Sequence, residues 1–191
     1  MADHRKLSRD MDLFHFEEHS PGMVFWHPQG LRLFRSIEDL MRQVYQGHGF
    51  EEVRSPIALS RSLWERSRHW EKFRQGMFVV GSVEADTDDE SALSVISPDY
   101  ALKPMSCPAH IAIYQSRKRS YRETPMRLME FGICHRNELS GTLSGCMRLR
   151  LFVQDDAHIF CRASDVQSEI SNFLNMVQQV YAAFGYDQFF L

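Results

Sequence analysis

The sequence lacks the features that mark a membrane protein, a disulfide-rich secreted protein or a strongly basic nucleic-acid binder. It has no run near the roughly eighteen apolar residues that a membrane-spanning helix needs, and no apolar signal segment at its start. Its four cysteines include no CxxC pair. Lys and Arg total 22 against 25 for Asp and Glu, so the net charge of −3 gives no overall attraction to a polyanion. We therefore expect a reduced, cytoplasmic protein that contacts no membrane.

Two segments nevertheless have a locally biased charge. Four cations gather within residues 117–122. A nucleic-acid patch and a solvated helix end would both explain them. Residues 81–97 hold five acids and few apolar side chains, which predicts a mobile acidic loop. This loop lacks the glycine and the terminal glutamate of a calcium-binding loop, so a metal site there is not favoured.

Two amphipathic helices are predicted from apolar residues that recur at steps of three and four. The second helix opens at Ser164 and Gln167, which match a capping box, and stops at Gly185. The first helix follows Pro28, and its apolar face holds Leu33, Ile37, Leu40, Met41 and Val44.

Between these helices the sequence alternates as expected for β-strands. Residues 126–133 predict a strand, and residues 147–154 and 157–161 predict its antiparallel partners. Residues 186–191 predict a further apolar strand, whose edge needs a neighbour in a sheet. We expect one domain over residues 1–191 with an α+β fold, in which helices flank a mostly antiparallel sheet that is incomplete at its C-terminal side.

The segment 135–160 combines residue types that suit a nucleoside triphosphate. Guanidinium groups bind phosphates through planar forks, an aromatic ring can lie flat on a base, and a carboxylate can accept from an amine or a hydroxyl. An amphipathic hairpin with one charged face would account for any one of these residues alone. Their joint spacing favours the nucleotide site. The residues are Arg136, Arg148, Arg150, Phe152, Asp155 and Asp156.

Several phrases of this sequence resemble the catalytic core of class II aminoacyl-tRNA synthetases, and among these most closely the threonyl enzymes. The resemblance runs from about residue 4 to residue 186. It implies the class II fold, built on an antiparallel sheet with flanking helices. The phrases are PGMVFWH at 21–27, WERSRHW at 64–70, LKPMSCPAH at 102–110, MEFGICHRNE at 129–138 and QDDAHIFC at 154–161.

The resemblance assigns an ATP site to the segment 135–160. It implies that Arg136 holds the α-phosphate and acts in catalysis, Glu138 lies at the adenine end, Arg148 reaches the γ-phosphate and Phe152 stacks on adenine. Mg²⁺ accompanies the ATP. These residue types suit the chemistry, because attack by an amino-acid carboxylate on the α-phosphorus builds negative charge that a fixed guanidinium stabilises. The attacking carboxylate is already ionised and needs no general base.

Threonine recognition is the second implication of the resemblance. Threonyl enzymes bind threonine through a zinc ion, and the matching ligands here are Cys107 and His158. Asp156 is placed to accept from the threonine hydroxyl or amine, with Met105 and Gln154 nearby. A site that must bond a hydroxyl rejects valine, because its polar groups would stay unpaired. Without the resemblance, a buried cysteine and a strand histidine 51 positions apart would be no zinc signature.

The resemblance thus predicts a threonine–tRNA ligase core that forms threonyl-adenylate from ATP and zinc-held threonine for transfer to tRNA. Residues 31–56 correspond to an element that forms a homodimer interface in the family. The third zinc ligand and the third class II motif lie in the family beyond the equivalent of Leu191. With two protein ligands zinc should bind more weakly than with three.

Six positions depart from the family pattern. Leu151 replaces a glycine before the stacking aromatic and is expected to narrow the space over adenine. Ala109 replaces a glycine and is expected to crowd the amino-acid pocket. Two alternatives therefore stay open: an inactive paralogue that serves as a binding, regulatory or dimerisation module, and a structural domain whose arginines bind any polyanion. The other departures are Arg68, Ser106, Leu139 and Ser144.

Overall fold

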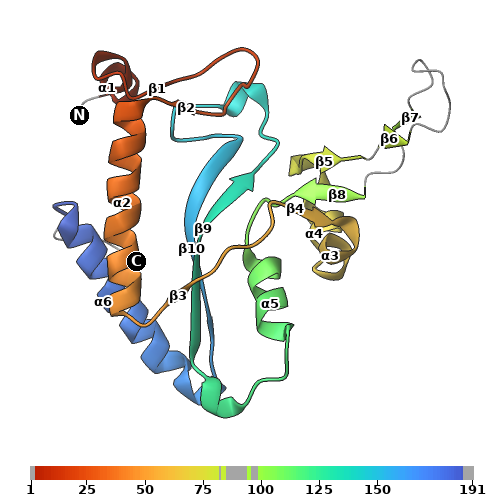
Figure 1. Ribbon diagram of the computed structural model, residues 1–191, viewed down its shortest axis with the longest axis vertical. Helices are drawn as coiled ribbons and strands as arrows, with labels where there is room; N and C mark the ends of the chain where they lie inside the picture. The colour runs from red at the N-terminus through yellow and green to blue at the C-terminus, as the bar shows by residue number, and fades with distance from the viewer. Residues whose placement is uncertain (1–2, 82, 85–93, 96–98, 187–191) are drawn as a thin grey trace.

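The computed structural model describes residues 3–81, 83–84, 94–95 and 99–186 (Figure 1). Helices α2 (Pro28–Gly47) and α6 (Val166–Ala183) lie on one side of a long hairpin, and α5 (Cys107–Gln115) lies on the other side. This arrangement of a largely antiparallel sheet between helices confirms the predicted α+β fold. The predicted last strand falls on residues 187–191, outside the described residues.

The hairpin consists of β9 (Met126–His135) and β10 (Leu151–Phe160), which pair antiparallel from Leu151↔His135 to Phe160↔Met126. The short strand β3 (Glu51–Glu52) adds to the free edge of β9 in parallel. The predicted strands are thus confirmed as neighbours, and the two predicted partners form one continuous strand, β10, that begins later than the predicted residue 147.

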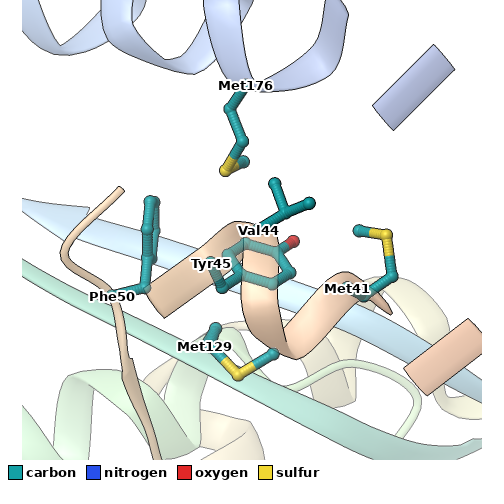
Figure 2. Close-up of a cluster of buried hydrophobic side chains, with 6 residues drawn as sticks. All are labelled: Met41, Val44, Tyr45, Phe50, Met129 and Met176. Atoms are coloured by element: carbon teal, nitrogen blue, oxygen red, sulfur yellow. The ribbon is translucent and has the colours of Figure 1, made fainter. Parts of the chain in front are cut away.

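The main core lies between α2, α6 and the hairpin. Met41 and Val44 of α2 contact Met129 of β9 and Met176 of α6, as Figure 2 shows. The predicted apolar face of α2 is only partly buried, because Leu33 and Ile37 remain exposed. The helix begins with Pro28 at its first position and ends at Gly47, as expected from these residue types.

The predicted capping box at the start of α6 is wrong. The helix begins at Val166 with Asp165 as its N-cap, and no side chain caps it. The Ser164 hydroxyl instead donates to the Asp165 carboxylate over 2.9 Å. A capping box forms elsewhere, between Ser120 and Glu123 at a short 3-10 helix, within the basic segment.

A second, smaller unit packs beside the hairpin. Its sheet pairs β4 (Ala58–Ser60), β8 (Tyr100–Leu102) and β5 (Val79–Val80) antiparallel, with Trp64, Trp70, Met77 and Ala101 buried against it. Arg68 lies between the two helices of this unit and has a φ of 60°. This backbone conformation favours glycine, which is the residue that the family pattern has at this position. The helices are α3 (Arg61–Arg66) and α4 (His69–Phe73).

The N-terminal segment and the acidic segment supply short elements. Helix α1 (His4–Asp10) precedes β1 (Phe14–His15), which pairs with β2 (Phe25–Trp26). In the acidic segment, β6 (Val83–Glu84) pairs with β7 (Ser94–Val95), and the rest of the predicted acidic loop lies outside the described residues. The short 3-10 helices are η1 (Arg74–Gly76), η3 (Tyr121–Glu123), η4 (Ser140–Thr142) and η5 (Ala163–Asp165).

Gly30 allows the first turn of α2 to contact the chain just before β1. A β-carbon at this position would stand 2.0 Å from the Leu13 carbonyl oxygen. Gly30→Ala should therefore cost about 3 kcal/mol or more of the free energy of unfolding. Gly47→Ala, in the same helix with nothing within 4 Å, should stay within about 0.5 kcal/mol of the wild type. Denaturant unfolding measures both, and equal stabilities would contradict this close approach.

Candidate functional site

The register of the hairpin places the predicted site residues of β10 on one face, except Asp155, which the alternation places on the other. Side chains alternate along a strand, so Phe152, Gln154, Asp156 and His158 of β10 point to the same side. This is the side on which α5 packs (Figure 1). The same alternation places Leu151 on the opposite face from Phe152. The expectation that Leu151 narrows the space over adenine stays a prediction, which this register does not favour.

Helix α5 brings Cys107 to the far end of this face. Ligand atoms of Cys107, Asp156 and His158 lie within 4.8 Å of one another, the only such group among the described residues. Thiolate, imidazole and carboxylate at this spacing fit a tetrahedral zinc ion. Burial, followed by the nearby Asp156 charge, raises the pKa of the Cys107 thiol. Without a metal it is therefore a thiol at neutral pH.

Asp156 is held by the backbone at the start of α5. The Ser106 amide donates to Asp156 Oδ2 over 3.4 Å. The Ser106 hydroxyl is fully buried and has no hydrogen-bond partner among the residues that the structure describes. A β-carbon at Gly132 would stand 2.6 Å from that hydroxyl, so the bare glycine on β9 is what lets α5 approach the sheet.

A buried polar network lies directly beneath this cluster. His158 Nδ1 is 2.9 Å from His110 Nδ1, and His110 Nε2 is 3.2 Å from Glu130 Oε2. Lys103 donates to Glu130 Oε1 over 3.0 Å, and Ser55 donates to the same carboxylate through its amide and its hydroxyl. Each polar group of the network therefore has a partner, as burial requires.

The network determines the charge of its members. Burial alone would raise the pKa of Glu130, but hydrogen bonds from His110, Ser55 and Lys103 outweigh it and lower that pKa to about 2. Burial lowers the pKa of His158, an effect that Asp156 opposes and His110 reinforces. Glu130 is thus an anion near neutral pH, while His158 favours its neutral form.

At the other end of the face Arg136 and Phe152 come together. The Arg136 guanidinium carbon lies 5.0 Å from the centre of the Phe152 ring, and Nε donates to the Pro104 carbonyl over 3.2 Å. This cation–π contact and hydrogen bond hold a positive charge beside an aromatic face. The pair has the chemistry to bind a phosphate and a base.

Glu138 and Arg148 form an ion pair across the loop between the two strands. Arg148 Nη2 and Nε lie 2.9 and 3.0 Å from Glu138 Oε2. Arg150 instead supports the loop, since it donates to the carbonyl oxygens of Glu138 and Pro21 and to the Ser140 hydroxyl. The Arg150 guanidinium is therefore engaged by the protein itself, unlike the phosphate contact that the sequence predicted for it.

The N-terminal segment braces this loop from outside. The Cys146 amide donates to His4 Nε2 over 3.1 Å, and Arg5 donates to the Ser144 hydroxyl over 3.1 Å. The Arg150 amide donates to the Gly22 carbonyl over 2.7 Å. Between the loop and residues 16–22 lies a cavity of about 350 Å³, which Arg148 lines.

Sequence reasoning missed several side chains at the site. His110 lies one helical turn after Cys107, so its spacing could have placed it on the same side of α5. His69 Nε2 lies 2.9 Å from the Met105 sulfur, and no local sequence pattern predicts this contact. In the basic segment, Arg117 and Arg119 pair with Glu123, which favours the solvated helix end over a nucleic-acid patch.

The sequence matches a known family over just over half of its length. Residues 93–191 match the family described as tRNA synthetase class II core domain (G, H, P, S and T). The chain belongs to the class II tRNA synthetase core family. This class II core is 50% identical over 186 residues to the threonine–tRNA ligase of Methylococcus capsulatus, and 51% identical over 185 residues to that of Saccharophagus degradans. The matches cover 97% of this chain and 27% of each relative's length.

Solved structures share the fold of this class II core. One is a crystal structure of the RNA binding domain of threonyl-tRNA synthetase from Cryptosporidium parvum Iowa II, with a TM-score of 0.87 and 38% identity over 97% of this chain and 43% of that one. Another is Giardia lamblia prolyl-tRNA synthetase in complex with prolyl-adenylate, with a TM-score of 0.79 and 20% identity over 94% of this chain and 35% of that one. The predicted class II fold and the resemblance to threonyl enzymes are confirmed.

Two further findings concern the cysteines and the helices of this class II core. All four cysteines are free. None of the helices in the described part of the chain has both the length and the apolar character that crossing a membrane requires.

Glu130 should make the stability of this class II core depend on acid. Its pKa lies at about 2 against an ordinary 4.5, so its contribution is complete above pH 4.5 and is lost as the pH falls towards 2. Glu130→Gln leaves the Lys103 charge buried without a counterion, which should cost about 3–5 kcal/mol at pH 7. The variant should also lose much of the acid dependence.

Denaturant unfolding at pH 7 and pH 3 measures both effects. Glu123→Gln is the matched control, since that carboxylate pairs with Arg117 in solvent and its removal should change stability little. Glu130→Gln as stable as this control would contradict the assigned network.

Proposed function

We propose that the chain is the part of a threonine–tRNA ligase that binds ATP and threonine and forms threonyl-adenylate. The observation that carries the proposal is the shared face of β10. One end presents Phe152 beside Arg136, and the other presents Asp156 and His158 beside Cys107. A nucleotide and an amino acid bound at these ends would meet over Gln154, where the carboxylate can attack the α-phosphorus.

ATP would bind at the Arg136 end. The adenine ring would stack on Phe152 near Glu138, and the guanidinium of Arg136 would stabilise charge that develops on the α-phosphate. Arg148 would hold the γ-phosphate, and Mg²⁺ would accompany the triphosphate. The ion pair of Arg148 with Glu138 supports this assignment, because it keeps the guanidinium in place before ATP arrives.

Threonine would bind at the zinc end. Cys107 and His158 would hold the ion, which in threonyl enzymes takes the amino group and the hydroxyl of the substrate. Asp156 would accept from one of these groups, with Met105 and Gln154 lining the pocket. A hydroxyl-dependent site of this kind rejects valine, since binding valine would leave buried polar groups without partners.

The proposal includes the partners of the longer relatives. A cytoplasmic ligase of this type would charge tRNA and act as a homodimer through residues 31–56. The exposure of Leu33 (52%) and Ile37 (41%) on α2 supports the dimer, because an apolar face of this kind suits an interface. The alternative function is an inactive binding or dimerisation module with the same fold.

Threonine-dependent exchange of labelled pyrophosphate into ATP tests the function. With zinc and magnesium the chain should catalyse exchange, and Arg136→Ala should abolish it while weakening ATP binding by about 10- to 100-fold. The control Arg162→Ala alters an exposed arginine that pairs with Asp165 beyond the end of β10, and should change neither. ATP binding without exchange would favour the inactive module, and unchanged ATP affinity in Arg136→Ala would overturn the ATP site.

Metal analysis tests the zinc site separately. The wild type should retain zinc after dialysis, and Cys107→Ser should lose most of it because the thiolate ligand is gone. Cys161→Ser is the matched control, since Cys161 lies outside the metal-ligand cluster. Equal zinc in Cys107→Ser and in the wild type would rule out this site.

A further inference from the structure

Arg148 lies at the end of a tight turn, residues 144–148, in the loop between β9 and β10. Ser144 and Arg148 exchange backbone hydrogen bonds across this turn, each amide donating to the other residue's carbonyl over 3.3 Å. The Met147 amide also donates to the Ser144 carbonyl, over 2.8 Å. The backbone of Arg148 is therefore tied to Ser144, and a group that holds Ser144 also holds Arg148.

Helix α1 contacts this turn at three consecutive residues. The Arg5 guanidinium donates to the Ser144 hydroxyl over 3.1 Å, and the Cys146 amide donates to His4 Nε2 over 3.1 Å. Gly145 lies between these two bonds with a φ of 48°, and a β-carbon there would stand 2.2 Å from His4 Nε2. The imidazole of His4 therefore lies directly against the bare backbone of the turn.

The same helix is anchored to the main core, at the end where α2 begins (Figure 1). The Leu13 amide donates to the Ser8 carbonyl of α1 over 2.8 Å, and the His27 amide donates to the Leu13 carbonyl over 2.9 Å. Ser8 is buried in this contact region. Helix α1 thus connects the start of α2 to the turn that carries Arg148.

The side chain of Arg148 needs this support because its own ion pair is largely in solvent. Nη2 lies 2.9 Å from Glu138 Oε2, but 54% of the Arg148 side chain is exposed, and exposed pairs are weak. A fixed backbone beneath the guanidinium reduces the conformational freedom that ligand binding has to remove. The contacts of α1 are therefore in a position to affect how well Arg148 binds a phosphate.

We propose that His4 and Arg5 are positioning residues, which hold the 144–148 turn so that Arg148 is preorganised for the terminal phosphate of ATP. The inference rests on the contact between Arg148 and the γ-phosphate in the proposed function. His4 and Arg5 do not touch ATP and act only through the turn. The N-terminal helix, 142 positions from Cys146 in the sequence, thereby contributes to nucleotide affinity.

Binding of ATP and of AMP to His4 variants tests the proposal. His4→Ala removes the acceptor of the Cys146 amide and should weaken ATP binding by about 3- to 10-fold in equilibrium dialysis. AMP has no γ-phosphate for Arg148 to hold, so its affinity should not change. His4→Gln, whose side-chain oxygen can accept in place of Nε2, should bind ATP more tightly than His4→Ala. His48→Ala is the matched control, since His48 bonds Gln179 of α6, and should bind ATP like the wild type.

Two further variants separate positioning from folding. Arg5→Ala changes an exposed side chain outside the core and should show the same selective loss of ATP affinity. Arg148→Ala should itself weaken ATP binding, and adding His4→Ala to it should cost nothing more, because the turn then carries no guanidinium.

Three results would overturn the positioning role and leave the ATP site standing. They are equal ATP affinity of His4→Ala and the wild type, an equal loss of AMP and ATP affinity in His4→Ala, and additive losses when His4→Ala and Arg148→Ala are combined. A wild type that binds no ATP would overturn both the positioning role and the proposed ATP site.

Discussion

The pairing of β9 with β10 is the constraint on which both ends of the site depend. A slip of one residue would move Asp156 and His158 to the other face of the sheet. Contacts on the opposite face hold the register. Tyr45 of α2 donates to the Asp155 carbonyl over 3.1 Å, and Arg127 of β9 pairs with Glu169 of α6 at 2.7 Å. The helices of the core therefore also fix the geometry of the functional face.

This register places two carboxylates opposite each other, and the buried network compensates the charge of one of them. Asp156 stands directly opposite Glu130 on the neighbouring strand, and like charges in this position repel. Lys103 and His110 bind Glu130 from inside the protein, while Asp156 accepts a long hydrogen bond from the Ser106 amide and lies 3.9 Å from the His158 ring. Glu130 is thus neutralised by protein groups, and Asp156 keeps its capacity to bind a ligand.

Period and residue type were enough to predict the hairpin and α2, whereas the shared face of β10 became visible only in the register of the structure. They failed where tertiary contacts determine how a side chain is bonded or buried. The Ser164 hydroxyl donates to the Asp165 side chain instead of capping α6. Leu33 follows the apolar period of α2, but its side chain is exposed because the core does not extend to that part of the helix. Lys103 and Glu130 are 27 positions apart, so no local pattern could pair them. The resemblance supplied Cys107 and His158, but only the fold shows His110 between metal site and core.

The contact of His4 with the loop after β9 has a consequence for the order of folding. Strands β9 and β10 are separated by residues 136–150, so their pairing closes a much smaller loop than a contact with the N-terminus and costs less chain entropy. The bond from Cys146 to His4 spans 142 positions and closes only when the two regions of the chain have met. We therefore expect the turn that carries Arg148 to gain its contacts with the N-terminal segment only after the two strands have paired.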